Sequence, residues 1–257
     1  TAQASKGRIR PESFADHYSQ ARMFYRSQSE VEQSHMVSAL VFELSKVQTP
    51  HVRSAVVSHL LVIDKGLAQR VAKGLGLTSL PAVAKPSVNP IDLAPSPATS
   101  IIGRMKPTLE GRSIAILVDD DSNAETIAAL QSALIAEKAI VKIIAPKIEG
   151  ATLSDGKHLP ADGHLAGSPS ALFDAVASVL PLASGEKLSK ESAAQDWFRD
   201  AFGHLKAIAA CKGTHIILRA AAVKPDQGFF APEDVADFIN GAKGRYWERE
   251  SKVRPDI

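Results

Sequence analysis

The chain has 257 residues, 45% of them hydrophobic and 23% charged, and its formal net charge is only +2. This length suits one large domain or two ordinary ones, and the balanced charge gives no electrostatic support for a nucleic-acid or membrane-surface partner. No apolar run approaches the roughly 18 residues that a membrane span needs. Residues 1–10 lack the apolar core of a signal peptide, and Cys211 is the only cysteine, so no intrachain disulfide can form.

Residues 11–77 predict a helical unit, because aromatic and aliphatic side chains recur there at helical spacing. Residues with side-chain oxygens stand where the later helices should begin, as N-caps do. They are Ser29 with its capping-box partner Glu32, Thr49 followed by Pro50, and Asp64. Gly74 and Gly76 suit the end of the last helix, since glycine readily adopts the left-handed conformation of a C-terminal stop.

Residues 79–107 predict a linker. Prolines at positions 81, 86, 90, 95, 97 and 107 remove backbone donors and exclude both a continuous helix and a central strand. The segment is longer than an ordinary loop. It also carries branched aliphatic residues, such as Ile91 and Ile102, for which a free tether has little use, so we expect it to wrap along a surface.

Residues 108–257 alternate predicted strands with predicted helices. Strands are expected at 113–118, 141–145, 175–182 and 207–211, and helices at 122–138, 189–205 and 232–250. The first strand is almost entirely apolar, as expected of a strand buried on both faces. Asp155-Gly156 predicts a hairpin excursion within 148–162. This order indicates an α/β domain with a parallel sheet, helices on both faces and right-handed crossovers.

The densest group of basic residues falls at the end of the last predicted helix. It comprises Lys243, Arg245, Arg249, Lys252 and Arg254. Because acidic residues interrupt this group, the pattern is typical of a solvated helix face.

Three motifs carry a resemblance to a known family. Asp16-His-Tyr18, continuing through Gln20-Ala-Arg22 to Phe24-Tyr25, is similar to the segment that follows the haem-binding core of haem catalases. Pro95-Ser-Pro-Ala-Thr-Ser-Ile-Ile102 and the Leu-x-Gly-Arg-x-x-Ala-Ile-Leu pattern of residues 109–117 follow in the family's order. Together they resemble the C-terminal third of large-subunit (clade 2) haem catalases, over essentially the whole chain.

The resemblance implies a domain organisation. Residues 1–78 correspond to the helical segment of the catalase core, 79–107 to a Pro-rich wrapping linker, and 108–257 to a flavodoxin-like domain. The whole protein would be a homotetrameric haem enzyme that decomposes hydrogen peroxide, with the catalase core of the same polypeptide as partner of this piece.

Cofactors are expected in the parent enzyme rather than here. In the family, the distal His and Asn and the iron-bound Tyr precede the Asp16–Tyr18 motif, and this chain begins at Thr1. We therefore expect a C-terminal piece without haem. Small-subunit catalases dock NADPH near the helix that corresponds to residues 24–28, where large-subunit catalases have the added domain instead, so no nicotinamide site is expected.

The added domain resembles the class I glutamine amidotransferase-like superfamily. Its enzymes hold a nucleophilic Cys at a strand-to-helix turn, in a Cys-x-Gly pattern, beside a Glu from the first helix. Cys211-Lys-Gly213 and Glu125 stand at the matching places, and a helix N-terminus would stabilise a thiolate there. We expect a strained turn at Cys211 with Glu125 within hydrogen-bond reach of its sulfur. We expect no reactivity, because Lys212 replaces the histidine that commonly follows.

Each of these residues also has a structural explanation. A lone Cys after a strand is usually a small buried hydrophobe, and Glu125 suits the dipole of a helix N-terminus. Asp119-Asp-Asp121 follows the first strand, where magnesium could bind, but it suits loop solvation and helix capping better. His158 and His164 lack zinc-like spacing, so no metal is expected.

Three functions remain in competition. The first is a non-catalytic assembly and stability module of a haem catalase. The second is a chaperone that holds unfolded-protein clients, as members of the same superfamily do. The third is a weak hydrolase or deglycase whose activity Cys211→Ser would abolish. The cellular location stays open between cytoplasm and secretion.

Overall fold

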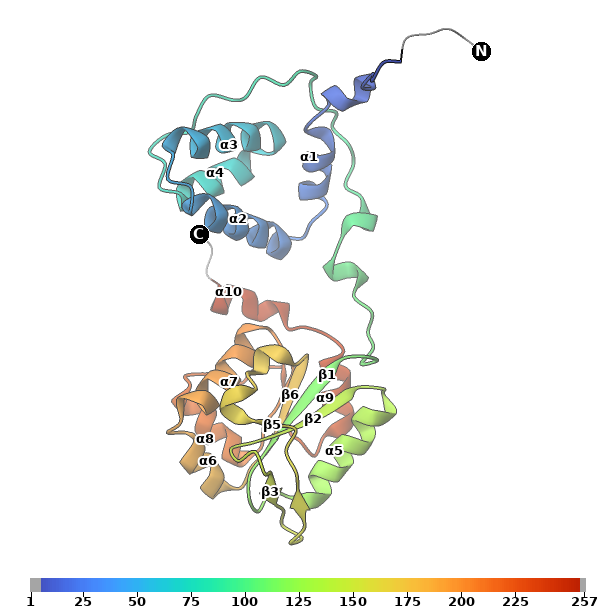
Figure 1. Cartoon of the computed structure of the whole chain (residues 1–257), viewed down its shortest axis with the longest axis vertical. Helices are drawn as coiled ribbons and strands as arrows, with labels where there is room; N and C mark the ends of the chain where they lie inside the picture. The colour runs from blue at the N-terminus through green and yellow to red at the C-terminus, as the bar shows by residue number, and fades with distance from the viewer. Residues whose placement is uncertain (1–5, 255–257) are drawn as a thin grey trace, which may run out of the picture. The chain divides into compact units, whose positions relative to one another are not determined.

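A computed structural model describes residues 6–254, which form two compact units (Figure 1). The first unit ends at Met105 and the second begins at Lys106. The helices of the first unit are α1 (Ser19–Arg26), α2 (Glu30–Ser45), α3 (Pro50–Ile63) and α4 (Lys65–Gly74), preceded by a 3-10 turn at Glu12–Ala15. Their apolar faces meet in one buried cluster that includes Val37, Val57 and Val71.

The predicted helix starts are found, with one difference in chemistry. The Ser29 hydroxyl accepts the Glu32 N–H at 3.3 Å while the Glu32 carboxylate accepts the Ser29 N–H at 2.8 Å, so the capping box is complete. Asp64 caps α4 through the N–H of Leu67 at 3.1 Å. Thr49 makes no side-chain cap, although Pro50 does begin α3. The restricted φ of proline accounts for that start without the hydroxyl.

The proline-rich segment follows the helices of its own unit. It contains no α-helix or strand, and its only regular turns are the 3-10 turns Pro97–Thr99 and Ile102–Arg104. Residues between Ile91 and Ile102 hydrogen-bond to side chains of α1 and α2 and of the turn between them.

The second unit is an α/β domain built on a six-stranded, wholly parallel sheet in the order β5-β2-β1-β6-β7-β8. The strands are β1 (Ser113–Val118), β2 (Ile140–Ala145), β5 (Gly163–His164), β6 (Ala175–Val179), β7 (Ile208–Ala209) and β8 (Phe229–Phe230). The order of the five strands from β2 to β8 is that of flavodoxin-like domains. The predicted hairpin is present as the antiparallel pair β3 (Ala151–Thr152) and β4 (His158–Leu159).

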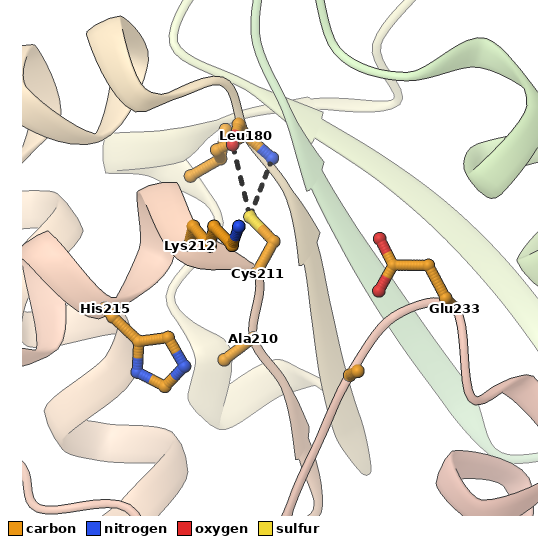
Figure 2. A pocket seen from close by; sticks show the side chains of 7 residues that line it. Leu180, Ala210, Cys211, Lys212, His215 and Glu233 are labelled. Carbon is orange, nitrogen blue, oxygen red and sulfur yellow. Dashed lines mark hydrogen bonds between the residues drawn. The ribbon is translucent and has the colours of Figure 1, made fainter.

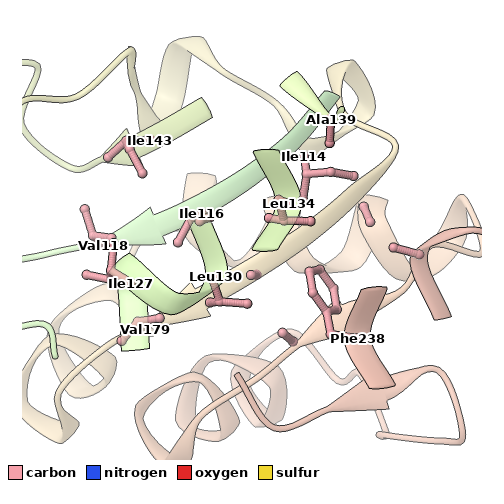
Figure 3. Close-up of a cluster of buried hydrophobic side chains, with 14 of the residues drawn as sticks. Ile114, Ile116, Val118, Ile127, Leu130, Leu134, Ala139, Ile143, Val179 and Phe238 are labelled. Carbon is pink, nitrogen blue, oxygen red and sulfur yellow. The ribbon is translucent and has the colours of Figure 1, made fainter. Parts of the chain in front are cut away.

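Both faces of the sheet are buried, as the apolar first strand predicted. Ile114, Ile116 and Val118 of β1 pack with α5 (Ala124–Ala136) and α9 (Val235–Ala242) (Figure 3). The alternate residues Ala115 and Leu117 pack on the other face. That face is covered by α6 (Leu182–Leu188), α7 (Ser192–Gly203) and α8 (Lys212–Ala220). Alternation across a pleated strand makes a continuous apolar run necessary here.

The sequence expectations were wrong at two places in this domain. The third strand stops at Val179, and a separate helix, α6, begins at Leu182. The expected helix over 232–250 is broken into α9, a 3-10 turn at Trp247–Arg249 and α10 (Glu250–Val253). Tyr246 donates its N–H to the carbonyl of Leu205 at 2.9 Å, which draws the chain away from the helix axis.

Within residues 6–254, no helix combines the length and apolar character needed to cross a membrane.

Candidate functional site

Cys211 lies between β7 and α8, at the carboxyl edge of the sheet, as predicted. It is the N-cap residue of α8, with φ −87° and ψ −179°. These are ordinary extended angles. Among the described non-glycine residues, positive φ occurs at Asp121, Lys138, Leu205 and Ala222 and not at Cys211. The expectation of a strained nucleophile turn is therefore wrong, because the chain passes from strand to helix without a left-handed residue.

The sulfur of Cys211 is held by the loop that follows β6 (Figure 2). Sγ lies 3.2 Å from both the N–H and the carbonyl oxygen of Leu180, accepting from the first and donating to the second. Thr214 Oγ1, one turn into α8, is also 3.2 Å from Sγ. The thiol thus ties the junction of β7 and α8 to the end of β6.

The hydroxyl groups of Ser178 and Thr214, both buried, form a hydrogen-bonded chain in which neither hydroxyl donates to the Cys211 sulfur. Ser178 Oγ donates to the carbonyl of Ala209 at 2.9 Å, so its single hydrogen is used. Thr214 must then donate in its 2.7 Å contact with Ser178. With both hydroxyl hydrogens committed, Thr214 can only accept from Cys211. The single S–H proton can be donated either to Thr214 or to the Leu180 carbonyl, so these contacts engage the sulfur fully within the fold, as a structural residue would be.

Glu125 does not join Cys211. It lies on the first turn of α5 and is exposed, and it is absent from the hydrogen-bond partners found for Sγ in the described chain. Helix α5 follows β1, and β6 separates β1 from β7. Two strand spacings amount to about 10 Å, which explains why the expectation of a direct contact was wrong.

A hollow of about 530 Å³ opens beside Cys211. Its lining includes Lys212, His215 and Glu233 but not Glu125. His215 is exposed, and Figure 2 shows its ring lying away from the sulfur, which points toward Leu180. Glu233 and His215, the acid and the base that line this hollow, are thus not arranged around the Cys211 sulfur as nucleophilic catalysis requires.

The acidic triplet after β1 is distributed among separate partners. Asp119 is 3.6 Å from the Lys187 ammonium, and Asp120 is 2.7 Å from that of Lys147. The Asp120 carboxylate also accepts the N–H of Thr152 at 2.9 Å, which holds the β3–β4 hairpin. In the described part of the chain no three His, Cys, Asp or Glu side chains gather as metal ligands would. Asp119 and Asp120 thus make ion pairs and a loop contact, and the expected capping role falls instead to Asn123, whose side chain accepts the N–H of Thr126 at the start of α5.

The basic group near the C-terminus is not a solvated helix face. Arg249 is only 1% exposed and is paired with Asp226, while Arg245 pairs with Asp174 at 3.2 Å. The expectation was wrong because the helix is interrupted and this stretch folds back onto the sheet domain. The spacing of charges carries no signal for such a contact.

The comparisons with known proteins agree with the motifs. The family model described as the C-terminal domain found in long catalases matches residues 110–250, which is more than half of the chain. The chain belongs to the long-catalase family. A second model, catalase-related immune-responsive, matches residues 11–75, so the family is represented on both sides of the proline-rich segment.

Long catalases from distant organisms are similar over nearly all of this chain. Catalase C of Rhizobium meliloti is 42% identical over 98% of this chain, and Catalase HPII of Pseudomonas putida is 35% identical over 96%. Catalase-B of Dictyostelium discoideum is 33% identical over 97%. The chain spans 37%, 35% and 37% of the lengths of these three relatives, respectively.

Proposed function

We propose that this chain is the C-terminal part of a large-subunit haem catalase, which decomposes hydrogen peroxide, and that it serves assembly and stability rather than turnover. The observation that carries the proposal is the match to long catalases over 98% of this chain and 37% of the relative. The chemistry named by those relatives is then supplied by the rest of the polypeptide.

The tyrosines support a haem site outside this piece, because each of the three makes contacts within its own unit. Tyr18 Oη lies 2.7 Å from His59 Nδ1. Tyr25 is buried and hydrogen-bonds Arg70. Tyr246 packs against Arg249, whose guanidinium carbon is 4.8 Å from the ring centroid. A haem needs a proximal ligand within a closed pocket, and these contacts favour a ligand supplied by the rest of the polypeptide.

The arrangement around Cys211 supports a non-catalytic second domain. Its thiol is engaged by Leu180 and Thr214, and Glu125 is exposed on another part of the domain. The residues buried on both faces of the sheet stabilise the fold. Cys211, at the position that holds the nucleophile in the superfamily this domain resembles, serves as a junction between a strand and a helix.

The test compares three proteins. They are the 257-residue chain, the full polypeptide that contains it, and that polypeptide cut after residue 106 of this numbering. We expect the chain, incubated with haemin and gel-filtered, to show neither a stoichiometric Soret band nor oxygen evolution from peroxide. The full polypeptide should show both. The shortened polypeptide should assemble incompletely or lose activity at a lower temperature.

Two results would refute the proposal. One is haem-dependent peroxide decomposition by the chain alone. The other is a shortened polypeptide whose oligomeric mass and thermal inactivation match those of the full one.

A further inference from the structure

Glu32 makes two sets of hydrogen bonds with its two carboxylate oxygens. Oε2 accepts from the N–H and the hydroxyl of Ser29 at 2.8 and 2.9 Å, which completes the cap of α2. Oε1 accepts from the main-chain N–H groups of Ile101 and Ile102 at 3.1 and 3.0 Å. Burial alone would raise the pKa of Glu32, but these donors together lower it. Glu32 therefore joins the start of a helix to residues about seventy positions later.

The segment from Ile91 to Ile102, called here the docked segment, is also held at earlier points. Its other main-chain contacts with α1 and with the turn that follows α1 are single bonds from Ile91 N–H to Ser19 Oγ at 2.7 Å, from Ser96 N–H to Ser27 Oγ at 2.8 Å, and from Gln28 Nε2 to Thr99 O at 3.1 Å. These bonds join neutral groups. Hydrogen bonds to a carboxylate are roughly twice as strong, so the Glu32 pair is the strongest main-chain attachment and also the last one along the chain.

The first contact of the chain with the second unit follows a few residues after Ile102. The carbonyl of Lys106 accepts from Arg112 Nη2 at 2.9 Å. Between that contact and Ile102 lie only Gly103, Arg104 and Met105, all of them exposed.

We propose that Glu32 is the anchor that sets the length of the tether between the two units. With Ile102 held, the path to Lys106 reaches at most about 14 Å when extended. If the hydrogen bonds to Glu32 break, the next attachment to the helical unit is at Thr99, and the path from Thr99 to Lys106 reaches at most about 25 Å when extended. The Glu32 carboxylate thus sets the maximum length of unattached chain between the two units, and this length nearly doubles when the carboxylate is released.

Amide hydrogen exchange of the intact chain tests the anchor at the atoms concerned. Glu32→Gln removes the charge but keeps a residue suited to the capping box, so α2 should remain. The exchange rates of the Ile101 and Ile102 amides should rise at least about tenfold, because charge-assisted bonds limit their local opening. Glu30→Gln is the matched control, since Glu30 is an exposed acid in the same helical turn.

Trypsin gives a second readout of the same release. Lys85 and Lys106 each precede proline, which leaves Arg104-Met105 as the bond in the 79–107 segment that trypsin cleaves readily. We expect faster cleavage there in Glu32→Gln than in Glu30→Gln. Exchange and cleavage that are equal in these two variants would overturn the proposal.

A variant on the linker side decides the case if Glu32→Gln disturbs the helix. Ile101→Pro removes one donor without touching α2. The preceding Ser100 is extended, as proline requires, and the φ of Ile101, −92°, needs to change by only about 10–30° to match that of proline. Faster exchange at Ile102 and faster cleavage at Arg104 are expected. Wild-type values for both would overturn the proposal regardless of the helix variant.

Discussion

Arg249→Ala should strongly destabilise the second unit. The Arg249 side chain is 1% exposed, and its Nε and Nη2 atoms donate to the Asp226 carboxylate at 2.8 and 2.7 Å. Nη1 donates to the carbonyl of Lys206 at 2.7 Å. The guanidinium carbon also lies 4.6 Å from the ring centroid of Phe202 and 4.8 Å from that of Tyr246. The residue therefore closes the irregular C-terminal stretch onto the edge of the sheet.

The size of the effect follows from what is left behind. Removing one partner of a buried ion pair costs about 3–5 kcal/mol. The side chain of Asp226 is 17% exposed, so water can solvate part of its charge and the lower end of that range applies. Loss of the cation–π contacts adds roughly 1 kcal/mol. We expect a loss of about 3–4 kcal/mol, or roughly 6–16 °C in Tm for a domain of this size.

Urea denaturation followed by tryptophan fluorescence measures this loss selectively, because both tryptophans, Trp197 and Trp247, belong to the second unit. Arg199→Ala is the matched control: Arg199 is 51% exposed and pairs with Asp196 on the surface, where such pairs contribute about 0–1 kcal/mol. If the free energies of unfolding of the two variants agree within error, the buried pair is not the closure inferred here.

The same pair predicts an acid dependence. Burial would raise the pKa of Asp226, but hydrogen bonds from Arg249 and from the Gly228 N–H outweigh it and lower the pKa. Stability from ionised Asp226 is thus present above its ordinary pKa of about 3.9 and is lost as the pH falls below that value. This acid-induced loss should be smaller in Arg249→Ala than in the wild type.

Burial, reinforced by repulsion from Arg245, lowers the pKa of Lys206 to about 8 from 10.5, so the wild type should gain stability as the pH rises between these values. Lys206→Met should lack that gain, and an unchanged pH profile would contradict the assignment. Gly213→Ala should cost about 1–3 kcal/mol, because the new Cβ would lie 2.5 Å from the Leu180 carbonyl oxygen. Gly203→Ala, with nothing within 4 Å of the new Cβ, should change the unfolding midpoint little, and equal midpoints for the two variants would refute the close approach. Cys211 should react with iodoacetamide more slowly than glutathione at neutral pH, because its sulfur is half-buried and engaged by Leu180 and Thr214; a faster reaction would show that the thiol is activated.

Local chemistry was sufficient to predict much of the fold. The strand at 113–118 is recognisable because burial on both faces requires an unbroken apolar run. Ser29 and Asp64 predict the helices that begin at Glu30 and Lys65, because their side chains accept hydrogen bonds from N–H groups only a few residues away. The proline-rich segment excludes an α-helix and a strand through its own covalent geometry. Each of these signals acts over a short stretch of chain.

Contacts between distant residues were decided by the tertiary structure. The sequence predicts Arg249 as part of a solvated basic stretch, but the helix ends after α9 and the following chain places Arg249 against Asp226. Glu125 and Cys211 occupy the expected places along the chain, yet β6 lies between the strands that precede them. Glu32 was recognisable as a cap, but its second oxygen binds Ile101 and Ile102. The sequence by itself determined the pieces because caps, prolines and apolar periodicity act locally, whereas strand order and backbone folding determined which side chains meet.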